Sequence, residues 1–130
     1  MKIPGELKYT KGDEWVKVEG NIATIGITDY AQDHLSDVVF VEISASVDDM
    51  VKAGTTVATL ESVKAAADVN APVSGKVVEV NEGLADAPDT VNSDPYAGAW
   101  MLKVEMIAPA ELEALMDAAA YEKYCEERES

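Results

Sequence analysis

Apolar and polar residues alternate along several short stretches of the chain, which is the pattern of strands that bury one face. Trp15–Ile27 (WVKVEGNIATIGI) alternates on both sides of Gly20-Asn21, a pair suited to the positive φ of a tight turn. This stretch therefore predicts a β-hairpin. Further strands are predicted at Asp37–Ile43, Thr56–Val63, Lys76–Val80 and Ala99–Met106. The pattern as a whole predicts a mostly β fold.

Helical patterns are confined to one internal segment and the C-terminal tail. A short helix is predicted from a cap at Thr28 through Leu35. Pro109 suits the first turn of a helix, and apolar residues then recur at helical spacing as far as Cys125. Two C-terminal helices are therefore expected over about 109–128.

Length and composition fit one small globular domain. No linker interrupts the chain, so residues 1–130 are expected to form a single domain with a β core over about 8–106. Apolar residues make up 48% of the chain and aromatic residues only 6%, so the core must be built mostly from valine, alanine and isoleucine. Valine and isoleucine again favour strands.

The charge balance excludes some classes of partner. Acidic residues number 25 against 10 basic ones, and the resulting net charge of −15 repels nucleic acid and anionic membranes. Proteins with basic surfaces are the expected partners. No run approaches the roughly 18 apolar residues of a membrane span, and the single cysteine, Cys125, cannot form an internal disulfide. A cytoplasmic location is therefore expected, although a mature organellar chain would show the same features.

One lysine, Lys64, stands clear of other charged residues in the stretch Glu61–Lys76 (ESVKAAADVNAPVSGK). The three alanines that follow it favour a helix, whereas the flanking Thr56–Thr59 and Val69–Pro72 favour extended chain, so local propensity leaves both structures open. In a hairpin, Lys64 would lie at or near the tip, where small neighbours leave room for another enzyme's active site. An ordinary solvated lysine is the alternative.

Other candidate sites carry weaker signals. His34 is the only histidine and has no histidine or cysteine close by in sequence, so a helix-surface or hydrogen-bonded role is expected rather than metal binding. Cys125 lies on the apolar stripe of the last helix, where burial is expected rather than redox chemistry. The sequence shows neither a pairing of nucleophile and base nor a glycine-rich phosphate loop, so no catalytic site can be argued from these residues.

Several blocks of residues along nearly the whole chain form a recognisable series: Tyr9–Lys11, Glu14–Val16, Ile25–Leu35, Asp37–Glu42, Glu61–Ala66, Ala71–Gly75, Val91–Tyr96 and Gly98–Trp100. In this order, the blocks resemble the H proteins of the glycine cleavage system. The resemblance implies a lipoyl/biotinyl-carrier-like flattened barrel sandwich with a short internal helix and C-terminal helices. In that family the lysine that matches Lys64 carries lipoic acid in amide linkage on a hairpin.

The resemblance also implies a function and a set of partners. The lipoyl arm would shuttle the aminomethyl group of glycine between a pyridoxal-phosphate glycine decarboxylase, a tetrahydrofolate-dependent aminomethyltransferase and a dihydrolipoyl dehydrogenase. Lipoylating enzymes would be further partners. The chain would be a carrier in one-carbon metabolism, and the chemistry would belong to those enzymes.

The family pattern points to four more site residues. Glu61, three residues before Lys64, and Gly75, eleven after it, match positions used for recognition during lipoylation. Glu14 and Asp68 match acidic positions near the aminomethyl group on the arm. Without the resemblance, Glu61 would be a solvated carboxylate at a strand end, Gly75 a turn glycine, and Glu14 and Asp68 surface charges.

The chain departs from the family pattern at three positions near these blocks. Asp13 stands where a histidine is common before Glu-Trp, and Gly12 where some members have a hydroxyl residue, so contacts of either with the arm are not carried over. Ser36 replaces a common glycine after the short helix. If that position is left-handed, serine costs roughly 1 kcal/mol there.

Related carriers and other functions remain as alternatives. Biotin carriers typically have methionine on both sides of the lysine, and the lipoyl domains of 2-oxo acid dehydrogenases typically have aspartate before it, whereas Lys64 lies between Val63 and Ala65. Both are disfavoured. Within the same fold, the alternative is an H-like protein that acts mainly as a lipoyl donor or relay. From another class, the alternative is an unmodified acidic interaction module.

Overall fold

The computed structural model describes residues 1–129, and Ser130, the last residue of the expected domain, lies outside them. The elements in chain order are β1 (Lys8–Tyr9), β2 (Glu14–Glu19), β3 (Ile22–Ile27), α1 (Asp29–Leu35), β4 (Val38–Ile43), β5 (Met50–Val51), β6 (Thr56–Ser62), β7 (Ala66–Asn70), β8 (Gly75–Val80), η1 (Glu82–Asp86), α2 (Thr90–Ser93), β9 (Leu102–Met106), η2 (Pro109–Ala114) and α3 (Ala118–Glu129). None of the described helices is long and apolar enough to cross a lipid bilayer.

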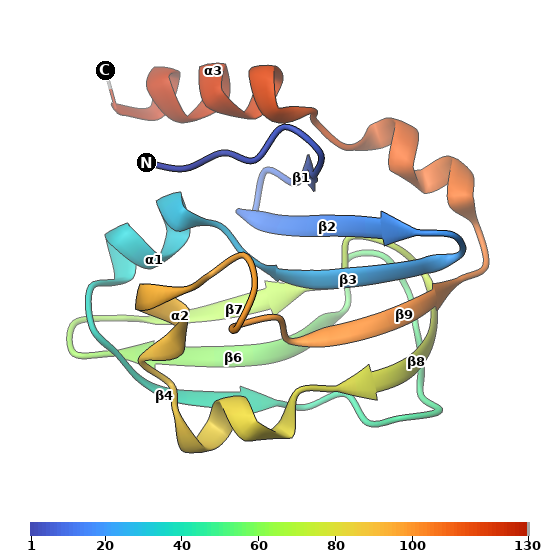
Figure 1. Ribbon diagram of the computed structural model, residues 1–130, viewed down its shortest axis with the longest axis horizontal. Coiled ribbons are helices and arrows are strands. Elements are labelled where there is room, and N and C mark those ends of the chain that lie inside the picture. The colour runs from blue at the N-terminus through green and yellow to red at the C-terminus, as the bar shows by residue number, and fades with distance from the viewer. Residues whose placement is uncertain (130) are drawn as a thin grey trace.

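Two antiparallel sheets pack against each other to form a flattened sandwich (Figure 1). The larger sheet has the strand order β1-β2-β3-β9-β8-β5, and the smaller has the order β4-β6-β7. This confirms the mostly β sandwich implied by the sequence, although the sheets do not close into a barrel. The interior between them is built mainly from valine, alanine, isoleucine and leucine, as the composition predicts.

The predicted first hairpin is formed by β2 and β3. Glu19 pairs with Ile22 across the Gly20-Asn21 turn, and Gly20 has the positive φ of 62° that the turn requires. Asn21 has no positive φ, and its side chain instead donates a hydrogen bond of 3.0 Å to the carbonyl of Met106 in β9. The hairpin is thereby tied to the next strand of the sheet.

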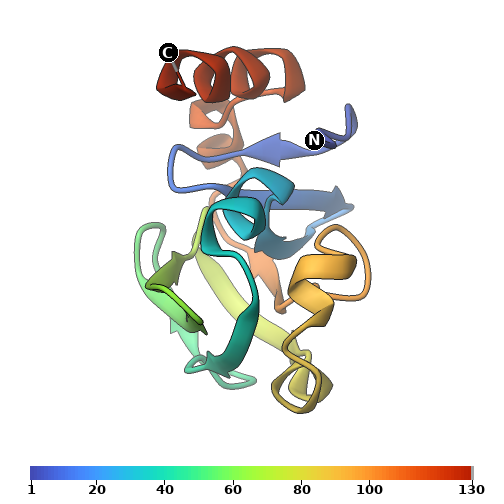
Figure 2. The same ribbon diagram turned by 90° about the vertical axis from the view of Figure 1, so that its left-hand side faces the viewer.

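A second, more aromatic cluster lies on the outer side of β1 and β2, beneath α3. Its buried members are Leu7, Tyr9, Trp15, Tyr30, Tyr121 and Cys125. Cys125 is 1% exposed, which confirms its predicted burial. The rings of Tyr9 and Tyr121 stack with their centroids 4.6 Å apart, and Figure 2 shows α3 lying across this end of the molecule.

The C-terminal segment forms two helices, as expected, but they are of different kinds. Its first part, η2, is a short 3-10 helix that begins at Pro109, and only α3 is an α-helix. Met116 lies in neither, because its backbone pairs with Tyr9 through two hydrogen bonds of 2.8 Å. Tertiary pairing with β1 therefore separates the two helices and takes Met116 out of the helical spacing in which the sequence placed it.

The predicted short helix α1 begins and ends as its sequence indicates, but its end is strained. Thr28 caps the N-terminus by accepting a hydrogen bond of 3.2 Å from the amide of Ala31. Ser36, which follows Leu35, has φ 64° and ψ −149°. This region of backbone conformation is used almost only by glycine, so the anticipated cost of serine at this position is present.

We predict that Ser36→Gly stabilises the fold by about 1 kcal/mol. It relieves roughly 1–3 kcal/mol of backbone strain and loses roughly 0.5–1 kcal/mol to the greater freedom of glycine in the unfolded chain. Urea denaturation measures the difference. Ser46→Gly, in the exposed loop after β4 and at a residue without positive φ, is the control and should destabilise. Equal effects of the two substitutions would contradict strain at Ser36.

Candidate functional site

Lys64 lies in the turn that joins β6 to β7, at one end of the smaller sheet. The backbone of Ser62 donates a hydrogen bond of 2.7 Å to the carbonyl of Ala65. The Ser62 hydroxyl accepts from the amides of Lys64 and Ala65, at 3.3 and 3.0 Å. The extended alternative is therefore correct and the helical one is wrong, because strand pairing with β6 outweighs the helix propensity of the three alanines.

The tip of this hairpin is held in place although its side chains are exposed. The amide of Val63 donates a hydrogen bond of 3.0 Å to the carbonyl of Asp37, just before β4. Val63 is 67% exposed, and both Lys64 and Ala65 are exposed as well. The turn projects at the left of Figure 1, below α1. Another protein can therefore reach the lysine, while the backbone that carries it has a defined position.

A cavity of about 220 Å³ lies beside the hairpin, between α1 and the strands β6 and β7. Its walls also include Gly12 and Asp13 from the loop before β2, and Arg128 from the last turn of α3. Ala67 belongs to this lining and lies three residues after Lys64 in the sequence, a span of about 10 Å of extended chain. The cavity is thus within reach of a flexible group attached to the lysine.

Glu14 is buried at the edge of this region, with 4% of its surface exposed, so its interpretation as a surface charge is wrong. Its carboxylate accepts hydrogen bonds from the hydroxyl of Thr10 and, at 3.2 Å, from the amide of Asn70 in β7. Burial raises the pKa of Glu14, and these hydrogen bonds oppose the rise. A Cβ atom at Gly12 would lie 2.9 Å from a Glu14 oxygen, so a side chain at residue 12 would crowd the carboxylate.

Asp68 lies on β7 opposite Thr59 and lines the cavity with an exposed side chain. The strand links it to Glu14, because the Asn70 amide that binds Glu14 lies two residues further along β7. The structure therefore brings Glu14 and Asp68, which are distant in sequence, to the same side of the hairpin.

Glu61 and Gly75 occupy different sheets. Glu61 is exposed near the end of β6, where it pairs with Ala66 and so lies next to the Lys64 turn. Gly75 begins β8 in the larger sheet, so its interpretation as a turn glycine is wrong. A Cβ atom there would lie 2.1 Å from the carbonyl oxygen of Glu105, which gives a packing reason for glycine at this position.

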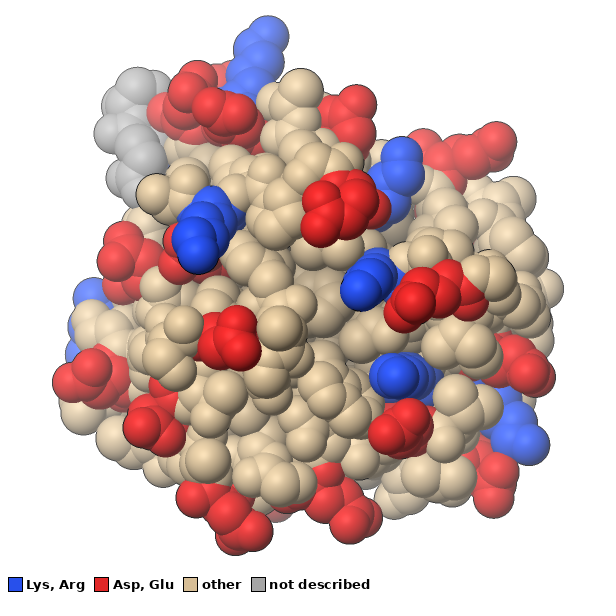
Figure 3. All heavy atoms as spheres, viewed as in Figure 1, with Lys and Arg blue, Asp and Glu red and all other residues tan. Residues whose placement is uncertain are grey.

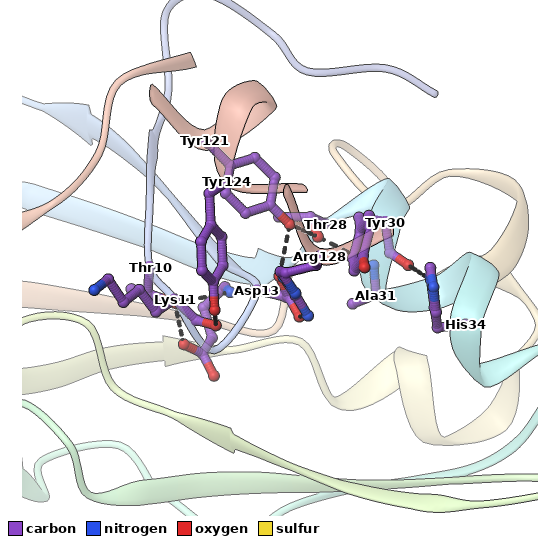
Figure 4. A network of polar contacts seen from close by, with 11 residues as sticks. Thr10, Lys11, Asp13, Thr28, Tyr30, Ala31, His34, Tyr121, Tyr124 and Arg128 are labelled. Carbon is purple, nitrogen blue, oxygen red and sulfur yellow. Dashed lines mark hydrogen bonds and ion pairs between the residues drawn. The ribbon is translucent and has the colours of Figure 1, made fainter. Parts of the chain in front are cut away.

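An ion pair that the sequence did not predict closes one wall of the cavity. Arg128 donates to both carboxylate oxygens of Asp13, at 2.7 and 2.9 Å. Its guanidinium lies 4.3 Å from the ring centroid of Tyr30 and 4.7 Å from that of Tyr124, and Figure 4 shows it between these rings. The one feature of the sequence that could have drawn attention to this residue is its composition, because Arg128 is the only arginine in the chain.

The structure places His34, the remaining candidate from the sequence, against Tyr30 of its own helix. His34 stacks on Tyr30 with ring centroids 4.2 Å apart, and its Nδ1 lies 3.0 Å from the Tyr30 carbonyl oxygen. Within residues 1–129 no group of three or more histidine, cysteine, aspartate or glutamate side chains is arranged to hold a metal ion. A larger hollow of about 640 Å³, between β4 and η1, contains none of the predicted site residues.

Comparison with known proteins identifies the family. Residues 7–128 match the family model described as glycine cleavage H-protein. The chain belongs to the glycine cleavage H-protein family. The glycine cleavage system H proteins of Anaeromyxobacter sp. strain K and Anaeromyxobacter dehalogenans are each 50% identical to it over 129 residues, covering 99% of this chain and 100% of theirs.

A solved structure extends the likeness to the whole fold. The crystal structure of a glycine cleavage system H protein from Mycobacterium marinum has a TM-score of 0.83 and 36% sequence identity, covering 92% of this chain and 95% of that one. Proteins of the glycine cleavage H-protein family carry lipoate and act with the other components of the glycine cleavage system. The chain is therefore a carrier component and not an enzyme by itself.

The burial of Glu14 predicts a measurable pH dependence of stability. The pKa of Glu14 is higher in the folded protein than in the unfolded chain, so between these two pKa values the native state binds more protons than the unfolded state. The free energy of unfolding therefore falls as the pH rises through the pKa of the folded state. Urea denaturation across pH 4–8 should show Glu14→Gln gaining stability relative to the native sequence as pH rises, and then levelling off. Glu19→Gln, an exposed carboxylate at the far end of β2, is the matched control, and a constant difference for Glu14→Gln would contradict the prediction.

Proposed function

We propose that Lys64 carries lipoic acid in amide linkage and shuttles the aminomethyl group of glycine. The observation that carries this proposal is the exposed Lys64 side chain on a turn whose backbone is held to Asp37. Family membership supports the same assignment, because Lys64 stands in the block Glu61–Ala66 that resembles the family's attachment motif. A cytoplasmic location is part of the proposal, since a chain with one cysteine cannot form an internal disulfide.

The residues around Lys64 fit a lipoyl arm. Ala65 and Ala66, which follow the lysine, add no bulk beside it, and the cavity next to the hairpin offers room for the end of the arm. A lipoyl group bound here would supply a disulfide on a tether that reaches on the order of 10 Å. Glu61, which is exposed next to the turn, would be recognised by the lipoylating enzymes. Gly75 would act in the same recognition, in addition to its packing role.

The proposed partners are a pyridoxal-phosphate glycine decarboxylase, a tetrahydrofolate-dependent aminomethyltransferase and a dihydrolipoyl dehydrogenase. A tethered group stays at high effective concentration once the carrier has docked, so brief contacts suffice. Acidic side chains are spread over the face seen in Figure 3, in keeping with the net charge of −15. Such a field favours encounter with basic surfaces around the partners' active-site entrances.

The same structure is compatible with a carrier that serves mainly as a lipoyl donor or relay, and with an unmodified acidic interaction module. The mass of the intact protein purified from its host separates the last of these from the other two, because only a module without lipoate has the mass of the polypeptide alone. Transfer of the aminomethyl group in an assay with the decarboxylase separates the shuttle from the donor or relay.

We predict that Lys64→Arg abolishes lipoylation and leaves the fold intact. Arginine keeps the positive charge at the exposed tip but offers no amine for the amide bond. Mass spectrometry after incubation with lipoylating enzymes measures the modification, and denaturation measures the fold. Lys52→Arg, at another exposed lysine, is the control and should be lipoylated normally. Lipoate on the Lys64→Arg protein would exclude Lys64 as the attachment site.

We further propose that the loaded arm rests in the cavity, near Asp68 and Glu14. Loss of the aminomethyl unit consumes one water and yields formaldehyde, ammonia and the free thiol. It starts from the deprotonated amine, whose lone pair expels the sulfur with its bonding electrons. Asp68 would favour the ammonium form and so remove that lone pair. Glu14, whose pKa is raised by burial, and a nearby ammonium would favour each other's charged forms.

We predict that Glu14→Gln and Asp68→Asn each speed formaldehyde release from the isolated, aminomethyl-loaded carrier by several-fold. Each substitution removes a negative charge that stabilises the ammonium, while the Lys64 turn keeps its own hydrogen bonds. The measurement is the decay of loaded carrier in the absence of tetrahydrofolate and aminomethyltransferase. Lipoylation of both variants should stay close to that of the native sequence. Native decay rates in both variants would remove these carboxylates from the mechanism.

A further inference from the structure

Arg128 brings the only guanidinium of the chain to the wall of the cavity proposed to hold the loaded arm. It comes from the last turn of α3, far in sequence from the other lining residues. A positive charge in this wall would repel the ammonium at the end of the arm. The bidentate bond to Asp13 places a carboxylate directly against that charge, so the two form a neutral unit.

Asp13 is held for this pairing by contacts on several sides. Its backbone has φ 69°, a conformation that aspartate and asparagine tolerate better than most residues. Its carbonyl accepts a hydrogen bond of 3.0 Å from the amide of Thr28, and its carboxylate accepts one of 2.8 Å from the hydroxyl of Tyr121 (Figure 4). The carboxylate would therefore keep its place if the guanidinium were removed.

The titratable and charged groups that face the cavity come from each element packed around it. They are Asp13 from the loop before β2, Tyr30 and His34 from α1, Asp68 from β7 and Arg128 from α3, with Glu14 buried behind Gly12. Once Asp13 and Arg128 are paired, the negative charge left in the lining belongs to Asp68. The pairing thus decides whether the charge of Asp68 acts on the ammonium uncompensated or is offset by Arg128, while Glu14 lies behind Gly12 in either case.

We propose that Asp13 is a positioning residue that cancels the charge of Arg128 in the cavity wall, so that Arg128 can close the cavity without destabilising the ammonium of the loaded arm. The inference rests on the proposed function, because it requires the arm to occupy this cavity. With its charge cancelled by Asp13, Arg128 closes the cavity wall with a planar guanidinium group held between the rings of Tyr30 and Tyr124. A family position where histidine is common is thus filled by a residue matched to this chain's single arginine.

The test is a cycle of two substitutions, read as formaldehyde release from the lipoylated, aminomethyl-loaded carrier. Asp13→Asn keeps the shape and the tolerance of positive φ but leaves Arg128 uncompensated. Release should become about threefold to tenfold faster, and the midpoint of its pH profile should fall by up to about one unit. Arg128→Gln removes the positive charge, leaves the Asp13 carboxylate in place and keeps a planar amide group in the wall, so release should be no faster than in the native sequence.

The double variant Asp13→Asn with Arg128→Gln decides between charge cancellation and simple support of the helix. Cancellation predicts that the second substitution rescues the first and returns release to within about twofold of the native rate. If the pair only supported α3, all three variants would release formaldehyde faster, and that result would overturn the proposal. Lys123→Gln, which removes an exposed positive charge from the same helix, is the matched control and should behave as the native sequence.

The same assay distinguishes failure of this proposal from failure of the proposed function. Fast release in Asp68→Asn together with a native rate in Asp13→Asn would keep the arm in the cavity and reject the role of Asp13. Native rates in Asp68→Asn, Glu14→Gln and Asp13→Asn would show that the arm does not rest in the cavity, and both proposals would fall. Unlipoylated protein after treatment with lipoylating enzymes would reject the attachment site itself.

Discussion

The hydrogen bond from the Val63 amide to the Asp37 carbonyl ties the Lys64 turn to the segment between α1 and β4, and the geometry of the site depends on this link. A carrier needs an exposed lysine at a defined position, and two-stranded tips on their own are only marginally ordered. The segment that receives the bond is itself held by Asn92, whose side chain donates 2.7 Å to the carbonyl of Ser36. Backbone strain at Ser36 is thus part of the same arrangement, since a chain leaving α1 in another direction would not place Asp37 under the turn.

The polar groups beside the hairpin are integrated into the fold instead of standing on its surface. Glu14 binds Thr10 and the Asn70 amide, so its carboxylate is buried with partners, and Gly12 leaves the space next to it clear. Among the described side chains no buried nitrogen or oxygen atom lacks a hydrogen-bond partner. A buried carboxylate with satisfied hydrogen bonds keeps a fixed position. Asp68 supplies an exposed charge on the neighbouring strand, so the region combines one rigid and one accessible carboxylate.

The C-terminal helix contributes to this region through the aromatic cluster. Stacking of Tyr121 on Tyr9 and pairing of Met116 with Tyr9 bring α3 across β1, and the helix then delivers Arg128 to Asp13. Burial raises the pKa of Tyr121 far above its ordinary value, so its hydroxyl stays protonated and donates to Asp13. In a chain with few aromatic residues, their concentration here explains how a short helix is held firmly enough to form part of a cavity wall.

The sequence alone predicted those features that depend on residues close together in the chain. The β2–β3 hairpin follows from alternation and a glycine at Gly20. The blocks of sequence from Tyr9 to Trp100, including the one around Lys64, pointed to the family because each is a short run of neighbouring residues. Four features needed the tertiary structure. The alanines after Lys64 adopt a strand because β6 is available to pair with them. Gly75 proved to be a close-packing position because Glu105, distant in sequence, lies against it. Glu14 is buried, and Arg128 faces the cavity, because chain segments more than fifty residues apart come together, and such contacts leave no periodic trace in the sequence.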